Sequence, residues 1–326
     1  MAVLVTGATG FIGQHLMAAL ISDQYPVHVL TRDIYKVQSL WTNDLIKIFQ
    51  IDPIDQTQAI ELWKDVEIVF HLACGSFAEN DVENYQKSIV VATQSLLTQA
   101  IKAKVKQFIF VSSVKAMGEK TEECLNEYSP AFPETAYGKA KLTAEQLVLS
   151  AGKDCTICGS VLRLPMVYGK STKSSILQMT RAIYRGYFPS LSKINNHRSM
   201  VHVVDVVQAM VLIAKNPKAS CQQIYLVTDG QSYSTDQIYT LICHALDRTT
   251  PRWRIPIGVL IFGAKIGDFM QRIFKIRIPL NSKTLDKLTS SAWYSIEKIQ
   301  TELGYRPQYS LTTALPEIIN QVKRLN

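Results

Sequence analysis

The chain has 326 residues, 47% of them hydrophobic, so it can bury a full core in one large domain or two smaller ones. Its 35 lysines and arginines and 27 acidic residues give a formal net charge of +8, but the basic residues are dispersed, which argues against a nucleic-acid interface. Six scattered cysteines, and an apolar N-terminal run with no basic segment before it, predict a cytoplasmic protein without a signal peptide or an integral membrane segment.

Apolar runs of strand length alternate with helical patterns through the first half of the chain. In chain order, strands are expected at 2–6, 27–31, 46–51, 67–73, 107–113 and 155–164. Helices are expected between them at 11–22, 91–103 and 136–150. Strands that are apolar along nearly their whole length are typical of a parallel sheet covered by helices on both faces. The pattern therefore predicts a doubly wound α/β core over residues 1–169.

The regular alternation ends near residue 169. A helix near 176–185, a polar loop at 192–199 and a mixed C-terminal region predict a smaller, partly helical lobe over 170–326, with some exchange of strands and helices between the two parts. Because open α/β sheets bind ligands at the carboxyl ends of their strands, we expect the substrate beside this lobe. The hydrophobic stretch 255–277, which ends in basic residues, predicts a helix packed in the core or against the lobe, in preference to peripheral membrane contact.

A glycine-rich turn follows the first expected strand. Gly7, Gly10 and Gly13 recur every three residues in the segment TGATGFIG, directly before the first expected helix. Backbone amides at a strand-to-helix turn, together with the positive end of the helix, bind a pyrophosphate, and glycine lets the backbone approach it closely. The turn therefore predicts a Rossmann-type fold that binds a dinucleotide in its first domain.

Three side chains form a candidate catalytic site. Tyr137 and Lys141 stand four residues apart and therefore share one face of the expected helix. The Lys141 ammonium is expected to favour the phenolate and lower the pKa of Tyr137 from its ordinary value near ~10, which makes the hydroxyl an acid or base near neutral pH. Ser113, at the end of an expected strand, can donate a hydrogen bond to a substrate carbonyl or alkoxide oxygen. A second Tyr-x-x-x-Lys, from Tyr294 to Lys298, lacks such a serine and is interpreted as a surface helix turn.

These segments resemble the extended short-chain dehydrogenase/reductase family, which contains nucleotide-sugar epimerases, dehydratases and reductases. Besides TGATGFIG, the similar segments are FHLAC, FVSSVKAMGE, AYGKAK, LRLPMVYGK, HRSMVHVVDVV and LGYRPQYSL, which spread over nearly the whole chain. The resemblance implies an NAD(P)-dependent enzyme with a Rossmann-type domain, a smaller substrate-binding lobe and a serine–tyrosine–lysine catalytic site. The cofactor-binding residues that it implies are Gly7, Thr9, Gly10, Phe11, Ile12, Gly13, Thr31, Arg32, Asp52, Leu72, Ala73, Tyr137, Lys141 and Pro165.

The resemblance also implies where a substrate binds. Arg198 matches the family arginine that holds a substrate diphosphate, a role that suits a bidentate guanidinium, and Lys115 is assigned to the substrate on the same basis. Met117, Met166 and Ile89 replace a tyrosine and two asparagines that are common in the family. These departures weaken the inference about sugar contacts and leave a hydrophobic ketone, sterol-like or flavonol-like, open as a substrate.

The cofactor is predicted from the end of the second strand. Arg32, directly after Thr31, suits the 2′-phosphate of NADP, whereas an NAD enzyme usually offers a carboxylate to the ribose at this point. Asp33 follows one residue later and leaves NAD open. The expected activity is NADPH-dependent reduction of a 4-keto sugar on a nucleotide. The alternatives are an NAD-dependent nucleotide-sugar 4-epimerase, a reductase of a hydrophobic ketone and a non-catalytic dinucleotide sensor. Dehydration is disfavoured because no carboxylate lies beside Ser113.

Neither a metal nor a macromolecular ligand is expected. Cys155 and Cys158 form a C-x-x-C motif, but no second cysteine pair or nearby histidine completes a zinc site. His71, His197 and His202 are given no catalytic role. The expected partner is a small nucleotide-sugar substrate, and a homodimer is left open.

Overall fold

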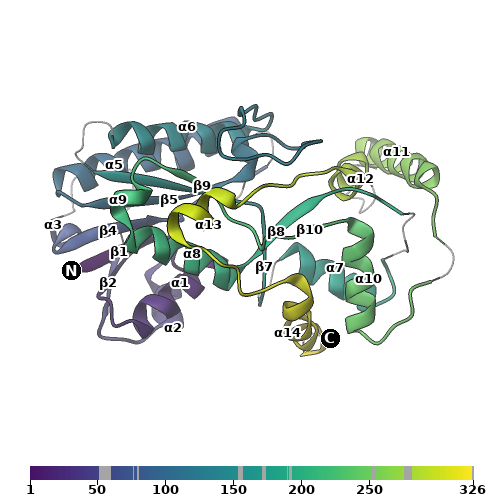
Figure 1. Cartoon of the computed structure of the whole chain (residues 1–326), viewed down its shortest axis with the longest axis horizontal. Coiled ribbons are helices and arrows are strands. Elements are labelled where there is room, and N and C mark those ends of the chain that lie inside the picture. Colours follow the sequence, from purple (N-terminus) through teal and green to yellow (C-terminus); the bar gives the residue numbers. More distant parts are fainter. Residues whose placement is uncertain are drawn as a thin grey trace.

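The computed structural model describes residues 1–50, 60–75, 77–78, 81–152, 157–170, 174–188, 190, 193–251, 254–274 and 281–324. Figure 1 shows a large sheet with helices on both faces and, beside it, a smaller lobe of helices and short strands. The chain crosses between the two parts more than once, and its C-terminal helix lies in the smaller lobe.

The large sheet has seven parallel strands in the order β3-β2-β1-β4-β5-β6-β9. Their bounds are β1 Ala2–Thr6, β2 Val27–Thr31, β3 Ile46–Gln50, β4 Val66–His71, β5 Gln107–Ser113, β6 Cys158–Leu164 and β9 Ile224–Leu226. The strand order reverses between β1 and β4, which is the point where doubly wound sheets bind ligands. The strand expected at 155–164 begins at Cys158, and residues 153–156 lie outside the described part of the chain.

Helices cover both faces of this sheet, as the alternating pattern predicts. On one face lie α1 (Phe11–Ser22) and α8 (Val203–Lys215), and on the other lie α5 (Ala92–Lys102) and α6 (Ala136–Ala151). Alternate side chains of β1 enter opposite cores, Val3 and Val5 on the α1 side and Ala2 and Leu4 on the α6 side. The Rossmann-type fold predicted from the sequence is therefore confirmed.

Short helices complete this part. They are α2 (Ile34–Leu40), α3 (Ile60–Trp63), α4 (Val82–Tyr85), the π-helix η1 (Gln86–Val91), the 3₁₀ helix η2 (Val114–Ala116), α9 (Pro217–Ser220) and α13 (Glu297–Leu303).

The smaller lobe is built on a three-stranded sheet in the order β10-β8-β7. Its elements are β7 (Met166–Tyr168), α7 (Ser175–Tyr184), β8 (Arg198–His202), β10 (Ser232–Tyr233), α10 (Thr235–Ala245), α11 (Ile257–Phe274), α12 (Ser282–Thr289) and α14 (Leu311–Arg324). Tyr168, Ile242 and Leu315 share its apolar core. Although α8 and β9 follow residue 169 in sequence, they pack on the large sheet, while β7 precedes it and pairs in the small one. The domain boundary at 169 stays a prediction.

Helix α11 packs against the small lobe, as expected from the sequence, but along part of its surface only. It buries Leu260 and Ala264 against Ile194 and Leu285, but most of its other large apolar side chains are exposed. Among the described residues, the helix is therefore buried along one face only. Within the described residues, no helix has both the length and the apolar composition needed to cross a membrane.

Candidate active site

The glycine turn between β1 and α1 forms one wall of a candidate cofactor site. Gly7 has a φ of +73°, and a Cβ atom there would lie 2.8 Å from the amide nitrogen of Ala73. A Cβ atom at Gly13 would lie 2.7 Å from the carbonyl oxygen of Ala8, so this glycine allows α1 to pack closely on the turn. Gly10 is the N-cap of α1 and donates its amide hydrogen to the Gly7 carbonyl at 3.0 Å.

A cavity of about 570 Å³ opens beside this turn, at the carboxyl ends of β1, β2 and β4. Of the predicted cofactor residues, those that line it are Gly7, Thr9, Gly10, Thr31, Arg32, Leu72 and Ala73. Asp33, which left NAD open in the sequence, also lines it, and the lining residues that sequence reasoning missed include Lys36, Cys74, Lys87 and Ser88. The Ser88 hydroxyl is buried without a hydrogen-bond partner among the described residues, so this wall can accept a further polar ligand.

The remaining predicted cofactor residues lie outside this lining. Phe11, Ile12 and Gly13 belong to α1, whose N-terminal end borders the cavity, and Pro165 follows β6. Their contact with a cofactor stays a prediction. Asp52 lies outside the described residues.

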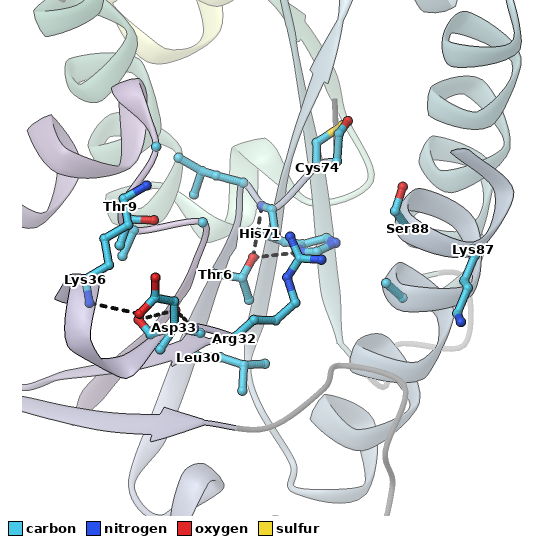
Figure 2. Close-up of a pocket in the computed structure, with 18 of the residues that line it drawn as sticks. Thr6, Thr9, Leu30, Arg32, Asp33, Lys36, His71, Cys74, Lys87 and Ser88 are labelled. Atoms are coloured by element: carbon cyan, nitrogen blue, oxygen red, sulfur yellow. Dashed lines mark hydrogen bonds between the residues drawn. The ribbon is translucent and has the colours of Figure 1, made fainter. Parts of the chain in front are cut away.

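The end of β2 supplies the charged side chains of the cavity (Figure 2). Arg32 and Lys36 line it together with Asp33, which is the N-cap of α2. The Asp33 carboxylate accepts the Lys36 amide hydrogen at 3.0 Å, and its own amide donates to the Thr31 hydroxyl at 3.1 Å. The Asp33 carboxylate caps the helix, whereas the Arg32 guanidinium and the Lys36 ammonium have no hydrogen bond or ion pair among the described residues.

His71 has a structural place at the floor of the cavity. Its ring nitrogens lie 2.7 Å from the Thr6 hydroxyl and 3.0 Å from the Thr93 hydroxyl, and Thr6 also accepts the Ala73 amide hydrogen at 3.1 Å. Burial, with a smaller contribution from the Lys141 charge, lowers the pKa of His71 to about 3. The ring is therefore neutral at physiological pH.

Ser113, Tyr137 and Lys141 come together where β5 meets α6. The Ser113 hydroxyl lies close enough to Tyr137 to lower its pKa through a side-chain hydrogen bond, which opposes the larger effect of burial. The Lys141 ammonium lies 5.9 Å from the centre of the Tyr137 ring, is fully buried, and donates a hydrogen bond of 2.9 Å to the Val111 carbonyl. It also lies 4.6 Å from the centre of the Phe110 ring. The end of β5 thus carries Ser113 and also the Val111 carbonyl that holds the Lys141 ammonium in place.

The expected effect of Lys141 on the tyrosine is not found. Burial raises the pKa of Tyr137 well above its usual value, and the opposing effect comes from the Ser113 hydrogen bond. Burial also lowers the pKa of Lys141, although the neighbouring charge of Glu145 opposes this. The sequence-based expectation of a lowered tyrosine pKa was therefore wrong for the protein alone, because helical spacing predicts proximity but not the loss of solvent.

Close packing of α6 on η2 positions the tyrosine. A Cβ atom at Gly138 would overlap the carbonyl oxygen of Lys115, so only glycine permits this approach without a shift. Thr135 caps the helix by accepting the Gly138 amide hydrogen at 3.1 Å, and its hydroxyl donates to Glu119 at 2.7 Å. The start of α6 is thereby fixed to the segment that carries Ser113.

Cys74 connects the cavity with the catalytic side chains. It lines the cavity directly after β4, and the pKa of its thiol is raised by burial and lowered by the charge of Lys141. Tyr85 packs edge to face on Tyr137, with ring centres 5.6 Å apart. Ser113, Tyr137 and Lys141 are not among the residues that line the cavity, so Cys74 is the lining residue that lies near them. A signal for Cys74 was present in sequence, since it follows the strand end FHLA.

Residues 3–228 match the model of the NAD dependent epimerase/dehydratase family. The chain belongs to this family. Like other members of the extended short-chain dehydrogenase/reductase type, it is an NAD(P)-dependent enzyme.

Relatives within the epimerase/dehydratase family cover almost the whole chain. A UDP-glucose 4-epimerase of Vibrio cholerae is 29% identical, over 95% of this chain and 92% of its own. An N-acetyl-alpha-D-glucosaminyl-diphospho-ditrans,octacis-undecaprenol 4-epimerase of Escherichia coli is 23% identical, over 96% of this chain and 92% of its own. The crystal structure of UDP-glucuronic acid 4-epimerase from Bacillus cereus, in complex with UDP-glucuronic acid and NAD, superposes with a TM-score of 0.78 at 22% identity and covers 100% of both chains.

The predicted substrate residues lie in η2, which carries Lys115, and at the start of β8, which begins at Arg198. Lys115 forms an ion pair of 3.2 Å with Glu119. Arg198 donates to the Lys287 carbonyl and, at 3.2 Å, to that of Ser290, so its guanidinium is held by the end of α12. Burial lowers the pKa of Arg198. Their contact with a substrate stays a prediction.

Tyr294 is a further residue of this region. It is buried and precedes α13 in the chain. Burial raises the pKa of Tyr294, and the nearby charges of Arg198 and Glu119 lower and raise it, respectively. Lys298 is bound to Gln223 at 2.7 Å. The interpretation of Tyr294 and Lys298 as a surface helix turn was therefore wrong, since the segment packs beneath η2. Among the described residues no cluster of side chains can hold a metal ion.

Proposed function

We propose that this chain is a nucleotide-sugar 4-epimerase that uses NAD and acts on a UDP-hexose. The observation that carries the proposal is the meeting of Ser113, Tyr137 and Lys141 where β5 meets α6, with the Lys141 ammonium 5.9 Å from the tyrosine ring centre and near Cys74, which lines the glycine-turn cavity. The similarity to a UDP-glucose 4-epimerase over most of both chains supports 4-epimerisation over the reduction favoured by sequence reasoning.

The dinucleotide is proposed to occupy the cavity beside the glycine turn. The amides of the turn and of the first residues of α1 would hold its diphosphate, and the close approach at Gly7 and the unpartnered Ser88 hydroxyl fit a bound polar ligand. Thr31 and Arg32 would contact the adenosine end, with Leu72 and Ala73 along one wall. When bound, the nicotinamide supplies a hydride acceptor that takes a hydride from a sugar carbon and returns it to the opposite face.

The chain's own residues move the accompanying proton. Tyr137 acts as its phenolate, held beside the Lys141 ammonium: its oxygen takes the proton of the sugar hydroxyl as the C–H bond breaks, and the neutral tyrosine gives the proton back when the C–H bond forms on the other face. Ser113 donates a hydrogen bond to the same sugar oxygen and so holds it against Tyr137. Lys141 places a positive charge where the negative charge develops on Tyr137.

The diphosphate of the sugar nucleotide is proposed to bind Arg198. Its guanidinium is pre-positioned by the Lys287 and Ser290 carbonyls, which leave part of its donor set for a phosphate. Lys115, beside Ser113, would contact the sugar or its phosphate. A cytoplasmic location stays a prediction.

A second candidate is NADPH-dependent reduction of a nucleotide-linked 4-keto sugar. The observation that favours it is the pair of cations, Arg32 and Lys36, that line the adenosine end of the cavity, since both suit a 2′-phosphate.

One experiment separates the two candidates. The purified protein is denatured and its released nucleotides are identified by mass spectrometry, and the intact protein is incubated with UDP-glucose, UDP-galactose or their N-acetyl forms without added cofactor. An epimerase releases NAD and interconverts one sugar pair, and Tyr137→Phe abolishes the interconversion. If no UDP-hexose is converted and NADPH is consumed only with a 4-keto sugar nucleotide, the reductase replaces the epimerase.

A further inference from the structure

Helix α11 carries an apolar face that the fold leaves uncovered. Of the seventeen exposed large hydrophobic side chains among the described residues, seven belong to this one helix. Val259, Phe262, Ile266 and Phe269 are spaced three and four residues apart and therefore form one stripe along the helix. Phe262 is 67% exposed and Phe269 is 65% exposed. A stripe of this kind on a soluble domain marks a contact with something apolar.

The opposite face of the helix holds it to the lobe. Leu260 and Ala264 are buried against Ile194 and Leu285, and the Asp268 carboxylate accepts the Ser282 amide hydrogen at 3.2 Å. Figure 1 shows α11 at the outer end of the small lobe beside α12, away from the large sheet. The apolar stripe thus lies on the face of α11 opposite the anchoring contacts, and its side chains are exposed among the described residues.

The charge around this helix is strongly positive. Between residues 252 and 287 the sequence has eight lysines and arginines but only two acidic residues, a net formal charge of +6 within a chain whose total is +8. Both acidic residues are engaged, Asp268 with the amide of Ser282 and Asp286 with the Lys120 ammonium at 2.6 Å, and one of the eight basic residues, Arg254, is paired with Asp236 at 2.6 Å. Lys265 is exposed on the flank of α11. An anionic surface is therefore the complement of this segment.

We propose that α11 is an interfacial helix that binds the surface of an anionic lipid bilayer, with its stripe in the headgroup and acyl boundary. An amphipathic helix with an aromatic apolar face and basic residues binds such a surface through apolar burial together with electrostatic attraction. A second copy of the chain is a poorer occupant, because an isologous contact would place two segments of charge +6 against each other. The helix lies beside α12, whose end holds Arg198, so the bilayer would be close to the substrate lobe.

The test is flotation of the full-length protein with vesicles of phosphatidylglycerol and phosphatidylethanolamine, compared with vesicles of phosphatidylcholine alone. The parent should bind the anionic vesicles, and added salt should weaken the binding. The double variant Phe262→Glu/Phe269→Glu should bind roughly tenfold or more weakly, because two apolar anchors become anionic. Phe132→Glu is the matched control, since Phe132 is an equally exposed phenylalanine, at 73%, in a loop distant in sequence. This control should bind like the parent.

A second measurement uses tryptophan fluorescence and introduces no charged side chain into the stripe. In Phe269→Trp, anionic vesicles should shift the added indole emission to the blue and protect it from an aqueous quencher. The proposal is overturned if the parent does not bind anionic vesicles, if the double variant binds them as the parent does, or if the added indole stays accessible. It is likewise overturned if vesicles are not bound and the double variant instead turns an oligomer into a monomer in sedimentation velocity, which assigns the stripe to a second copy.

Discussion

Tyr137 has a pKa that burial raises, whereas Lys141, one helical turn later, has a pKa that burial lowers. Both shifts favour the neutral forms of two side chains that stand side by side. A negative charge on the tyrosine oxygen is therefore compensated only when Lys141 carries its proton, because both side chains are buried away from bulk water. Glu145, a further turn along α6, is paired with Arg163 at 2.7 Å, so it is not available to neutralise the lysine fully.

Replacing Tyr137 by Phe tests the proton transfer. We expect turnover to fall by roughly a hundredfold or more, because acid–base catalysis contributes that order, while dinucleotide binding is retained. Initial rates and cofactor titrations on the purified variant measure the two effects. Tyr128→Phe, which changes an exposed tyrosine, serves as the control and should leave the rate unchanged. Turnover of Tyr137→Phe within a factor of two or three of the parent would remove Tyr137 from the mechanism.

Arg32 is the residue that tests the cofactor. Arg32→Ala should weaken NADP(H) binding by roughly ten- to a hundredfold, or about 1.5–3 kcal/mol, because a charge-assisted hydrogen bond to the 2′-phosphate is lost. NAD(H) binding should change little, since it has no phosphate at this position. Titrations of both cofactors on parent and variant give the comparison. Equal losses for the two cofactors would contradict a role for Arg32 in reading the phosphate.

At the scale of elements, a close backbone contact positions helix α6. Helix α6 lies against η2 because Gly138 has no Cβ, and the same contact sets the distance between Tyr137 and Ser113. Gly138 lies within the Tyr-x-x-x-Lys motif. The role of this glycine depends on the Lys115 carbonyl, 23 positions earlier in the chain. A change at the glycine therefore acts on catalysis through the placement of the helix.

Gly138→Ala tests this placement. The added methyl group must displace the Lys115 carbonyl, so we expect a loss of about 1–3 kcal/mol in the free energy of unfolding and a clear fall in kcat with little change in cofactor binding. Urea unfolding and initial rates measure both. Gly258→Ala is the control, because a Cβ atom there meets no atom within 4 Å. A kcat equal to that of the parent would show that the helix position is not limiting.

At the scale of the whole molecule, Asp229 joins the two parts. Its carboxylate accepts hydrogen bonds from Tyr168 at 3.0 Å and Tyr233 at 2.9 Å, and its amide donates to the Met200 carbonyl at 2.8 Å. The segment just after β9, the last strand of the large sheet, is thereby tied to all three strands of the small one. Burial raises the pKa of Asp229 to about 6.

This pKa predicts how stability depends on pH. Between the ordinary value near 4 and about 6, the folded protein keeps a proton that the unfolded chain has released, so the contribution of Asp229 to stability falls as the pH rises through this window. Asp229→Asn removes that contribution and keeps an acceptor for the tyrosines. The free energy of unfolding of the variant should therefore rise with pH more steeply than that of the parent, by up to about 1.4 kcal/mol per pH unit. Urea unfolding at pH 4, 5, 6 and 7.5 measures the slopes, and parallel slopes would contradict the assignment.

Local patterns determined much of the fold and of the candidate site. The strands at 2–6, 27–31 and 107–113 and the helix at 11–22 have the bounds expected from their apolar runs, because each pattern depends on residues close together in the chain. The glycine turn was predictable for the same reason, and so was the helical face shared by Tyr137 and Lys141.

Tertiary structure decided what depends on distant segments. The pKa of Tyr137 is raised because the folded chain excludes solvent from its hydroxyl. Tyr294 is buried because it packs under η2. Lys87 lines the cavity because its helix faces the end of β2. The sequence determined that α11 is apolar, but only the assembled lobe decided that its apolar stripe stays exposed, because burial requires a neighbour that the chain pattern does not specify.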